Sequence, residues 1–310
     1  MREITINEND AGQRLDKFLT KFMPKLPPAM LYKSLRKNCV RVNGKHVKDG
    51  AHKLSNGDKL SLYFKDEFFS DGTQMVKKSS IKLDIVYEDE NILLINKPAG
   101  IVAHADDKNT ADTLVDGIKS YLYEKGEFNP SAEYSFSPAL SNRLDRNTAG
   151  IIIAAKNAAA LRAVNEKIRE RQIQKLYLCV ADGIFEKKSD VLESYLTRHE
   201  KTVSVSDTVS DNSKLIKTKY TVLAEKDRAS LVEVELMTGR THQIRAQLSA
   251  IGHPLSGDTK YGSKTARNYK LCSYKLKFVF PPDGGILDYL TGREFAISVD
   301  FAKKFDSQKS

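Results

Sequence analysis

The sequence predicts an α+β protein in two parts: a small N-terminal domain, and a larger domain built on a mixed, largely antiparallel sheet flanked by helices. The chain has 310 residues, which exceeds one typical domain and suggests two. Strand-like runs outnumber helix-like stripes and fall into hairpin-like groups. Positive charge is uneven, because residues 1–65 carry +8 of the net charge of +10. We therefore predict domains at 1–65 and 82–303, a linker at 66–81 and a tail at 304–310.

The charge of the N-terminal domain indicates a polyanionic partner. Residues 1–65 contain 14 Lys and Arg against 6 Asp and Glu. A nucleic-acid-binding module attached to a more neutral domain is expected to show this concentration. The alternative is that these side chains are ordinary solvated Lys and Arg.

Cysteine usage and hydropathy exclude several other protein classes. The three cysteines are far apart and have no CxxC or Cys/His ligand spacing, which indicates a reducing compartment and no structural zinc. The first residues are polar, and the longest apolar run, from Ile151, is far too short to span a bilayer. No Gly-rich cofactor loop is present. We expect a cytoplasmic monomer that uses no metal and no cofactor.

The N-terminal domain is expected to contain two helices and a hairpin. Apolar residues recur at helical spacing in 13–22, which places Asp16 in a first turn, where a carboxylate favours the helix dipole. A second short helix is expected at 29–38. Asn43-Gly44 supplies the positive φ angles of a tight hairpin turn within 39–47, and another strand follows in 56–64.

The larger domain is expected to alternate strands with a few helices. Segment 85–100 reads as strand, acidic turn, strand and Pro-Gly loop. Further strands are expected at 150–156, 176–184, 218–225, 230–237 and 296–301. Helices are expected at 113–124, 157–171 and 241–252.

The two helices, the basic edge and the Asn-Gly hairpin together resemble the S4 domain, a small RNA-binding module. The resemblance covers residues 12–65 and rests on RLDKFL followed by LRKNCVRVNGK. It implies an RNA-binding surface on one side of the second helix and on the hairpin. The residues expected there are Lys33, Arg36, Lys37, Arg41 and Lys45.

The tetrapeptide Arg-Leu-Asp-base occurs twice, at 14–17 and at 143–146, but its two aspartates have different settings. Asp145 lies between two arginines and ahead of an apolar β-branched run, so it is expected on a loop that leads into a buried strand. Such loops often carry reactive groups, and neighbouring arginines favour the ionised carboxylate that a nucleophile needs. The alternative is that Asp145 only pairs with Arg143 or caps the turn at Thr148.

Cationic side chains crowd the start of the helix predicted at 241–252. Cations are disfavoured at a helix N-terminus, so Arg240 and Arg245 there indicate a site for anions such as phosphate or carboxylate. His242 is a candidate member of that site, or else a hydrogen-bonded core histidine. Gln243 completes the polar group.

Several separated motifs in one order resemble the RluA-type pseudouridine synthases. They are KPAGIVAH, NRLDRNTAGIIIAAKN, QKLYLCVADG, LMTGRTHQIRAQL and GHPLSGDTKYG. The resemblance covers residues 84–300, and with an S4-like module in front it is greatest to the C-type branch that acts on large-subunit (23S) ribosomal RNA. It implies a catalytic Asp145, with Tyr177 and Arg245 as the other catalytic residues. It also implies that Arg143, Arg240, His242 and Gln243 contact RNA.

The implied reaction is an isomerisation of uridine that needs no redox or group donor. The target base must leave its stack, and Tyr177 would pack on it. Arg245 would hold Asp145 ionised, whereas the attack of Asp145 on the ribose or on the uracil ring is left open.

The chain departs from the family pattern at Asn142, Ala149 and Ala246, and LCSYKLKF replaces the usual LHA-type segment. None of these departures touches the three implied catalytic residues, but they leave the RNA target open, tRNA included. Two other functions remain: an inactive ribosome- or RNA-binding protein, and an N-glycosidase that releases uracil.

Overall fold

The computed structural model describes residues 1–69, 76–105, 112–200, 202–265 and 268–306. The chain forms two compact units. The first contains Met1–Ser80, Val115–Ala139 and Ala155–Leu161, and the second contains Ile81–Leu114, Leu140–Ala154 and Arg162–Ser310. The functional boundaries proposed from the sequence, with a separate S4-like module, stay a prediction.

The first unit contains the two predicted helices and a small antiparallel sheet. The hairpin at Asn43-Gly44 is confirmed, since Asn43 has φ 51° and Gly44 has φ 77°. The strands follow the order β1-β4-β2-β3 in the sheet. The elements of residues 1–69 are β1 (Arg2–Thr5), α1 (Leu15–Phe22), α2 (Pro28–Arg36), β2 (Val40–Val42), β3 (Lys45–His46), β4 (Lys59–Leu62) and the 3-10 turn η1 (Asp66–Phe68).

Aromatic side chains join the start of the predicted linker to the core of the first unit. Phe18 and Phe22 of α1 stack with their ring centroids 5.5 Å apart. Phe69 is buried against Phe22, 5.7 Å between centroids, and Tyr134 packs on both α1 rings. Phe68 and Phe69, at the start of the expected linker, thus pack on this core, while 70–75 lie outside the described residues.

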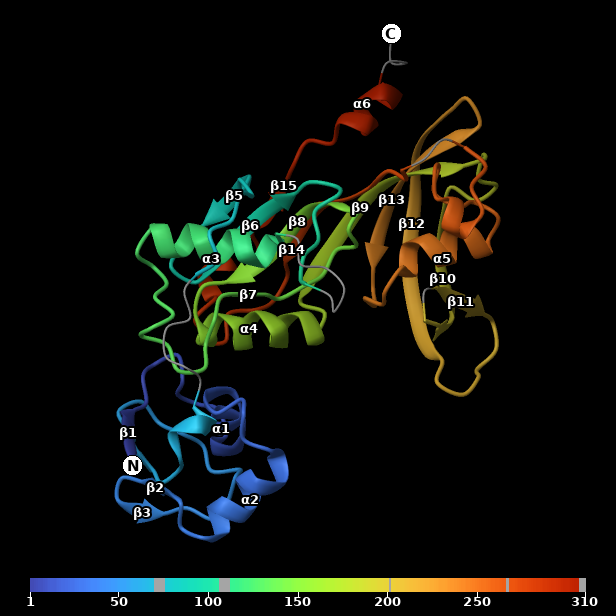
Figure 1. Ribbon diagram of the computed structural model, residues 1–310. Coiled ribbons are helices and arrows are strands. Elements are labelled where there is room, and N and C mark those ends of the chain that lie inside the picture. The colour runs from blue at the N-terminus through green and yellow to red at the C-terminus, as the bar shows by residue number, and fades with distance from the viewer. Residues whose placement is uncertain (70–75, 106–111, 201, 266–267, 307–310) are drawn as a thin grey trace. The chain divides into compact units, whose positions relative to one another are not determined.

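The second unit holds most of the larger sheet (Figure 1). In the part of the chain that the structure describes, this sheet has eleven strands, and nine follow the order β11-β10-β12-β13-β9-β14-β8-β6-β5. β15 pairs with β14, and β7 pairs with β8. The strands are β5 (Ile85–Glu88), β6 (Ile92–Lys97), β7 (Ala139–Leu140), β8 (Ala149–Ala155), β9 (Ile173–Asp182), β10 (Ser189–Arg198), β11 (Val203–Ser206), β12 (Lys214–Lys226), β13 (Ala229–Leu236), β14 (Leu271–Phe278) and β15 (Glu294–Ala296).

The helices of the rest of the chain include the three that the sequence predicts. The three predicted helices are α3 (Leu114–Glu124), α4 (Ala158–Arg169) and α5 (Gln243–Ala250). A further helix, α6 (Asp300–Asp306), and the 3-10 turns η2 (Thr259–Tyr261) and η3 (Asp288–Leu290) complete the described elements. Helix α5 contacts strands β10, β11 and β12 and covers that part of the sheet (Figure 1). Among the described residues, no helix is both long and apolar enough to cross a membrane.

The strand pairing in the structure agrees with the largely antiparallel sheet that the sequence predicts. β12, β13, β9 and β14 pair antiparallel with their neighbours in that order, whereas β14 and β8 pair in parallel. The strand expected at 296–301 is wrong. β15 ends at Ala296, and Asp300 opens helix α6, where an acidic residue is favoured in the first turn. Strands β1, β7, β10, β11 and β14 were not predicted. β10 shows why: only Ser194 and Leu196 of this strand are buried, and its apolar Val191 is exposed, so its sequence lacks a clear alternation of apolar and polar residues.

Candidate active site

Asp145 lies on the loop that leads into the buried strand β8, as the sequence predicts. The amide of Thr148 donates to the carbonyl of Asp145 at 3.0 Å, so the backbone, rather than the carboxylate, closes this turn. The Asp145 side chain is 27% exposed. A substrate can therefore reach the carboxylate.

Gly150 allows β8 to cross very close to β14. A Cβ at this position would lie 2.3 Å from the carbonyl oxygen of Ser273, and the φ of +113° is itself unfavourable for other residues. Ser273 pairs with Gly150 on one side and with Tyr177 of β9 on the other. The crossing thus sets the Asp145 loop and Tyr177 on neighbouring parts of the same sheet.

Tyr177 is almost completely buried, with 5% of its surface exposed. Burial raises the pKa of its phenol, and the nearby charge of Asp145 acts in the same direction. The side chain is therefore neutral at physiological pH. It offers the site an apolar ring and an intact hydroxyl group.

Arg245 of α5 joins two carboxylates. Its Nη1 donates to Oδ2 of Asp145 at 3.2 Å. Its Nε and Nη2 donate to the two carboxylate oxygens of Asp258, at 2.6 and 2.9 Å. Burial opposes the charge of Arg245, but the hydrogen bond with Asp258 and the nearby carboxylates raise its pKa overall. The guanidinium is a fixed cation, and its third nitrogen, Nη1, is the one that donates to Asp145.

Two tyrosines stack on the Arg245 guanidinium. Its central carbon lies 4.4 Å from the ring centroid of Tyr269 and 4.9 Å from that of Tyr261. The Tyr269 hydroxyl is 3.4 Å from Oγ1 of Thr148, in the turn that holds Asp145. Aromatic faces favour a cation, so this packing restricts the rotamer of Arg245 as well as its position.

His242 lies directly before α5 and faces Asp145. Its backbone adopts the left-handed conformation, φ 56° and ψ 15°, which is unusual for a residue other than glycine. Nδ1 is 2.7 Å from the hydroxyl of Tyr261, and Nε2 is 3.6 Å from Oδ2 of Asp145. Burial lowers the pKa of the imidazole, and so does the charge of Arg245, although Asp145 opposes them. His242 is therefore neutral at physiological pH.

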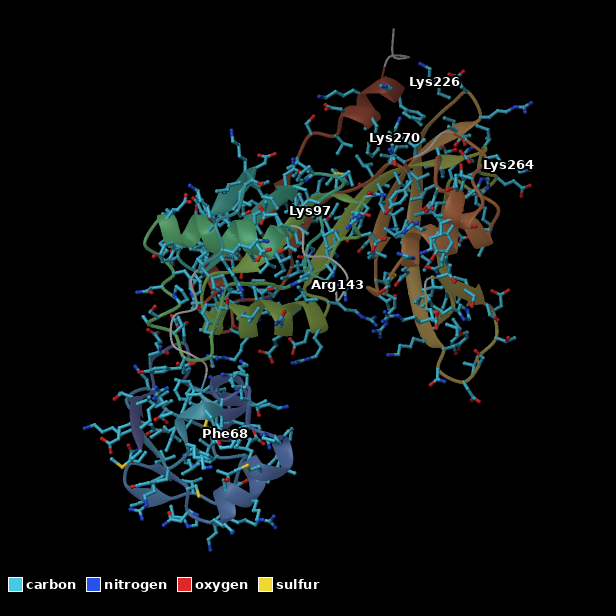
Figure 2. The ribbon with its side chains drawn as sticks, in the orientation of Figure 1. Phe68, Lys97, Arg143, Lys226, Lys264 and Lys270 are labelled. Carbon is cyan, nitrogen blue, oxygen red and sulfur yellow. The ribbon has the colours of Figure 1, made fainter. Side chains whose placement is uncertain are left out.

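Lys97, at the end of β6, is fully buried (Figure 2). Its ammonium group donates to the carbonyl oxygens of Pro98, Ile101 and Arg146, at 2.9, 3.0 and 3.1 Å. Burial lowers its pKa to about 8. Because Arg146 follows Asp145 directly, Lys97 ties the loop that carries Asp145 to the loop after β6.

Gln243 is 2% exposed, and its amide is fully used within the protein. Oε1 accepts hydrogen bonds from the Thr238 hydroxyl and the Arg240 amide, and Nε2 donates to the Lys217 carbonyl and the Thr218 hydroxyl. This position corrects the expected RNA contact of Gln243. The residue instead holds the loop that precedes α5.

The other basic residues expected to bind RNA are at the surface. Arg143, on the loop ahead of β8 (Figure 2), and Arg240 are exposed. Within the described residues, Arg143 forms no ion pair with Asp145, so Arg245 is the arginine that pairs with it. In the first unit, α2 exposes Lys33, Arg36 and its C-cap Lys37, while Arg41 lies over the Tyr63 ring at 5.6 Å.

The residues that sequence reasoning missed lie mainly in one turn. Asp258 and Tyr261 belong to GDTKYG, whose glycines marked it as a functional loop without assigning any side chain. Tyr269 gave no signal of its own. Lys97 belongs to the KPAG motif, but nothing in the sequence indicates that its ammonium group is buried.

The arrangement suits nucleophilic chemistry at a carboxylate. The Asp145 carboxylate is flanked at Oδ2 by the cation of Arg245 and the neutral ring of His242. In the described part of the chain, no hydrogen bond reaches Oδ1, which leaves that oxygen available for attack. Among these same residues, no group of His, Cys, Asp and Glu side chains could hold a metal ion. The expectation that no cofactor is needed stays a prediction.

Comparison with known proteins agrees with this chemistry. A family model described as RNA pseudouridylate synthase matches residues 91–250. The ribosomal large subunit pseudouridine synthase C of Vibrio parahaemolyticus is 32% identical, covering 84% of this chain and 80% of its own. The protein of the same name in Salmonella typhi is 30% identical, covering 92% and 90%.

A solved structure has a similar fold. The human RNA pseudouridylate synthase domain containing 4 superposes with a TM-score of 0.55 at 21% identity, covering 69% of this chain and 88% of the human chain. At this identity the likeness concerns the fold. The matched family segment, 91–250, contains Asp145, Tyr177 and Arg245.

Proposed function

This chain belongs to the RNA pseudouridylate synthase family, and we propose that it modifies uridines of large-subunit (23S) ribosomal RNA, with Asp145 as the nucleophile. The enzyme is an isomerase that acts on RNA. The target is taken from relatives whose names include the ribosomal large subunit. The nucleophile is supported by one observation above all: Asp145 is accessible and held at Oδ2 by Arg245, at 3.2 Å.

In the isomerisation, the bond between N1 and the ribose C1′ breaks, the uracil turns, and C5 joins C1′. The proton leaves C5 and N1 gains one, so the atoms balance. Asp145 attacks through Oδ1, either at the ribose or at the uracil ring. Arg245 holds the carboxylate in position through Oδ2. Tyr177 packs on the extruded base, and its hydroxyl acts on a proton of the sugar.

We assign RNA recognition outside the active site to basic side chains of both units. In the second unit these are Arg143 and Arg240. In the first unit we assign an S4-like role to α2 and the hairpin that follows it. The residues there are the exposed Lys33, Arg36 and Lys37, and the partly buried Arg41. We further propose that the enzyme acts in the cytoplasm as a monomer.

Product analysis separates this function from its alternatives. Purified protein would be incubated with 23S ribosomal RNA and, separately, with tRNA, and the nucleosides would be analysed after digestion. Pseudouridine in the 23S RNA is expected. Free uracil would instead indicate an N-glycosidase, and unchanged RNA would indicate a protein that only binds. Pseudouridine in tRNA alone would contradict the proposed target.

A further inference from the structure

We propose that His242 is a further catalytic residue, a neutral imidazole that carries its proton on Nε2 and donates a hydrogen bond to the uracil. This inference rests on the proposed function, because it concerns the base that Asp145 converts. The ring is 16% exposed and its Nε2 faces the catalytic carboxylate. It is therefore next to the position that a reacting uracil must occupy.

The contacts of the ring determine which nitrogen carries the proton. The Tyr261 hydroxyl oxygen accepts a hydrogen bond from the Val203 amide at 3.3 Å. Its own proton is then available to Nδ1 of His242, 2.7 Å away. An unprotonated Nε2 would also point its lone pair at Oδ2 of Asp145, 3.6 Å away, which is repulsive. Both contacts favour the tautomer with the proton on Nε2.

The proton on Nε2 is not used within the protein. At 3.6 Å, Nε2 is too far from Asp145 for a good hydrogen bond. In the ranges that the structure describes, no other group receives a hydrogen bond from this nitrogen. The hydrogen bond with the Tyr261 hydroxyl holds the ring in place, and the left-handed backbone, φ 56°, is a kind of strain commonly found at functional sites.

The surroundings also keep the ring neutral. Burial lowers its pKa below 6.5. The groups that face it are the carboxylates of Asp145 and Asp258 and the cations of Arg245 and Lys260, whose effects oppose one another. A charged ring would pair with Asp145 and weaken it as a nucleophile, whereas a neutral donor leaves it free.

A donor at this position matches the charge that develops in the reaction. When the bond to N1 breaks, the electron pair stays on the uracil and spreads over N1 and the two carbonyl oxygens. A preorganised donor to one of these atoms is stronger in the transition state than in the ground state. His242 therefore acts on turnover more than on RNA affinity.

The test compares His242→Phe, which keeps the ring volume but has no donor, with His242→Gln, which keeps a side-chain N–H. Turnover would be followed by release of tritium from RNA labelled at uracil C5, and RNA affinity would be measured separately. His242→Phe should lower turnover about 10²- to 10³-fold, as the loss of one such donor does. RNA affinity should stay within about threefold. His242→Gln should recover at least about tenfold of the loss.

The matched control is His199→Phe, on the surface of the second unit, where the imidazole hydrogen-bonds to the Ser204 hydroxyl. It should leave turnover unchanged. Turnover of His242→Phe equal to that of the unmodified enzyme, or equal rates for the Phe and Gln variants, would overturn the inference while leaving the proposed function intact. Absence of pseudouridine with the unmodified enzyme would overturn both.

A second measurement does not depend on any variant. Nitrogen-15 NMR of the imidazole in the intact protein distinguishes the protonated ring nitrogen from the bare one. The proton is expected on Nε2 at neutral pH. A proton on Nδ1, or a doubly protonated ring, would overturn the inference.

Discussion

Nη1 of Arg245 donates to Asp145, while Asp258 holds the same guanidinium by two hydrogen bonds, at 2.6 and 2.9 Å. Both partners of this ion pair are buried, with 7% and 2% of their side chains exposed. The position of the guanidinium is therefore determined by Asp258 and by the two tyrosine rings that cover it. The direction in which Nη1 points at Asp145 follows from that position.

The variant Asp258→Asn should lower turnover. Arg245 loses its charged partner, so its guanidinium moves relative to Asp145. Loss of a hydrogen bond to a charged group costs about 1.5–3 kcal/mol, which corresponds to about 10- to 150-fold in rate. Single-turnover rates at saturating enzyme would measure it, with thermal unfolding as a control for folding. A fall in RNA affinity at an unchanged rate would show that Asp258 acts on binding instead.

Asp16→Asn should destabilise the first unit by more than a helix-dipole effect. Asp16 is buried and accepts two hydrogen bonds from Arg14, at 3.0 and 2.7 Å, and another from the Lys17 amide. We expect a loss of about 1–3 kcal/mol in the free energy of unfolding, against about 0.3–1 for the dipole alone. Denaturant unfolding of the two proteins checks this, and a loss below about 0.5 kcal/mol would contradict it.

Lys97 should make stability rise with pH between about 8 and 10.5. Burial lowers its pKa in the folded protein, so in this window the unfolded chain still binds a proton that the folded protein has lost. Stability relative to Lys97→Met should therefore increase across the window, by at most about 3 kcal/mol. Below pH 8 the difference between the two proteins should be constant. A difference that falls as pH rises would contradict the assignment.

Replacing Lys33, Arg36 and Lys37 together with Gln should weaken RNA binding and reduce its salt dependence. These side chains are exposed at α2 and its C-cap, so the change leaves the core of the first unit intact. If three phosphates lose their partners, the slope of log affinity against log salt should fall by about two units. The same three-residue change should not alter turnover at saturating RNA. Equal slopes for the two proteins would mean that these basic side chains are solvated and do not contact RNA.

Local patterns predicted the parts of the fold that depend on neighbours in sequence. The stripe of Phe18, Leu19 and Phe22 gave α1, and Asn43-Gly44 gave the hairpin. The same patterns could not show that β14 lies parallel to β8, because the pairing of Ser273 with Gly150 joins segments more than a hundred residues apart.

The candidate site likewise contains residues that sequence motifs could indicate and residues that only tertiary packing brings together. Motifs with a fixed order indicated Asp145, Tyr177 and Arg245 through a family resemblance, and the structure brings Arg245 to Asp145. The partner role of Asp258 depends on how the glycine turn folds back on α5, which periodicity does not encode. The burial of Asp16 and Gln243 likewise depends on tertiary packing, so a surface contact was predicted for Gln243 where a buried one is found.

The most direct test of the account is pseudouridine formation by Asp145→Asn on 23S ribosomal RNA. The substitution keeps the size of the side chain and removes the nucleophile, so pseudouridine should fall below detection while RNA affinity stays within a few-fold. Unfolding should be nearly unchanged, because the side chain is partly exposed. Pseudouridine formed by Asp145→Asn at a rate near that of the unmodified enzyme would contradict the account.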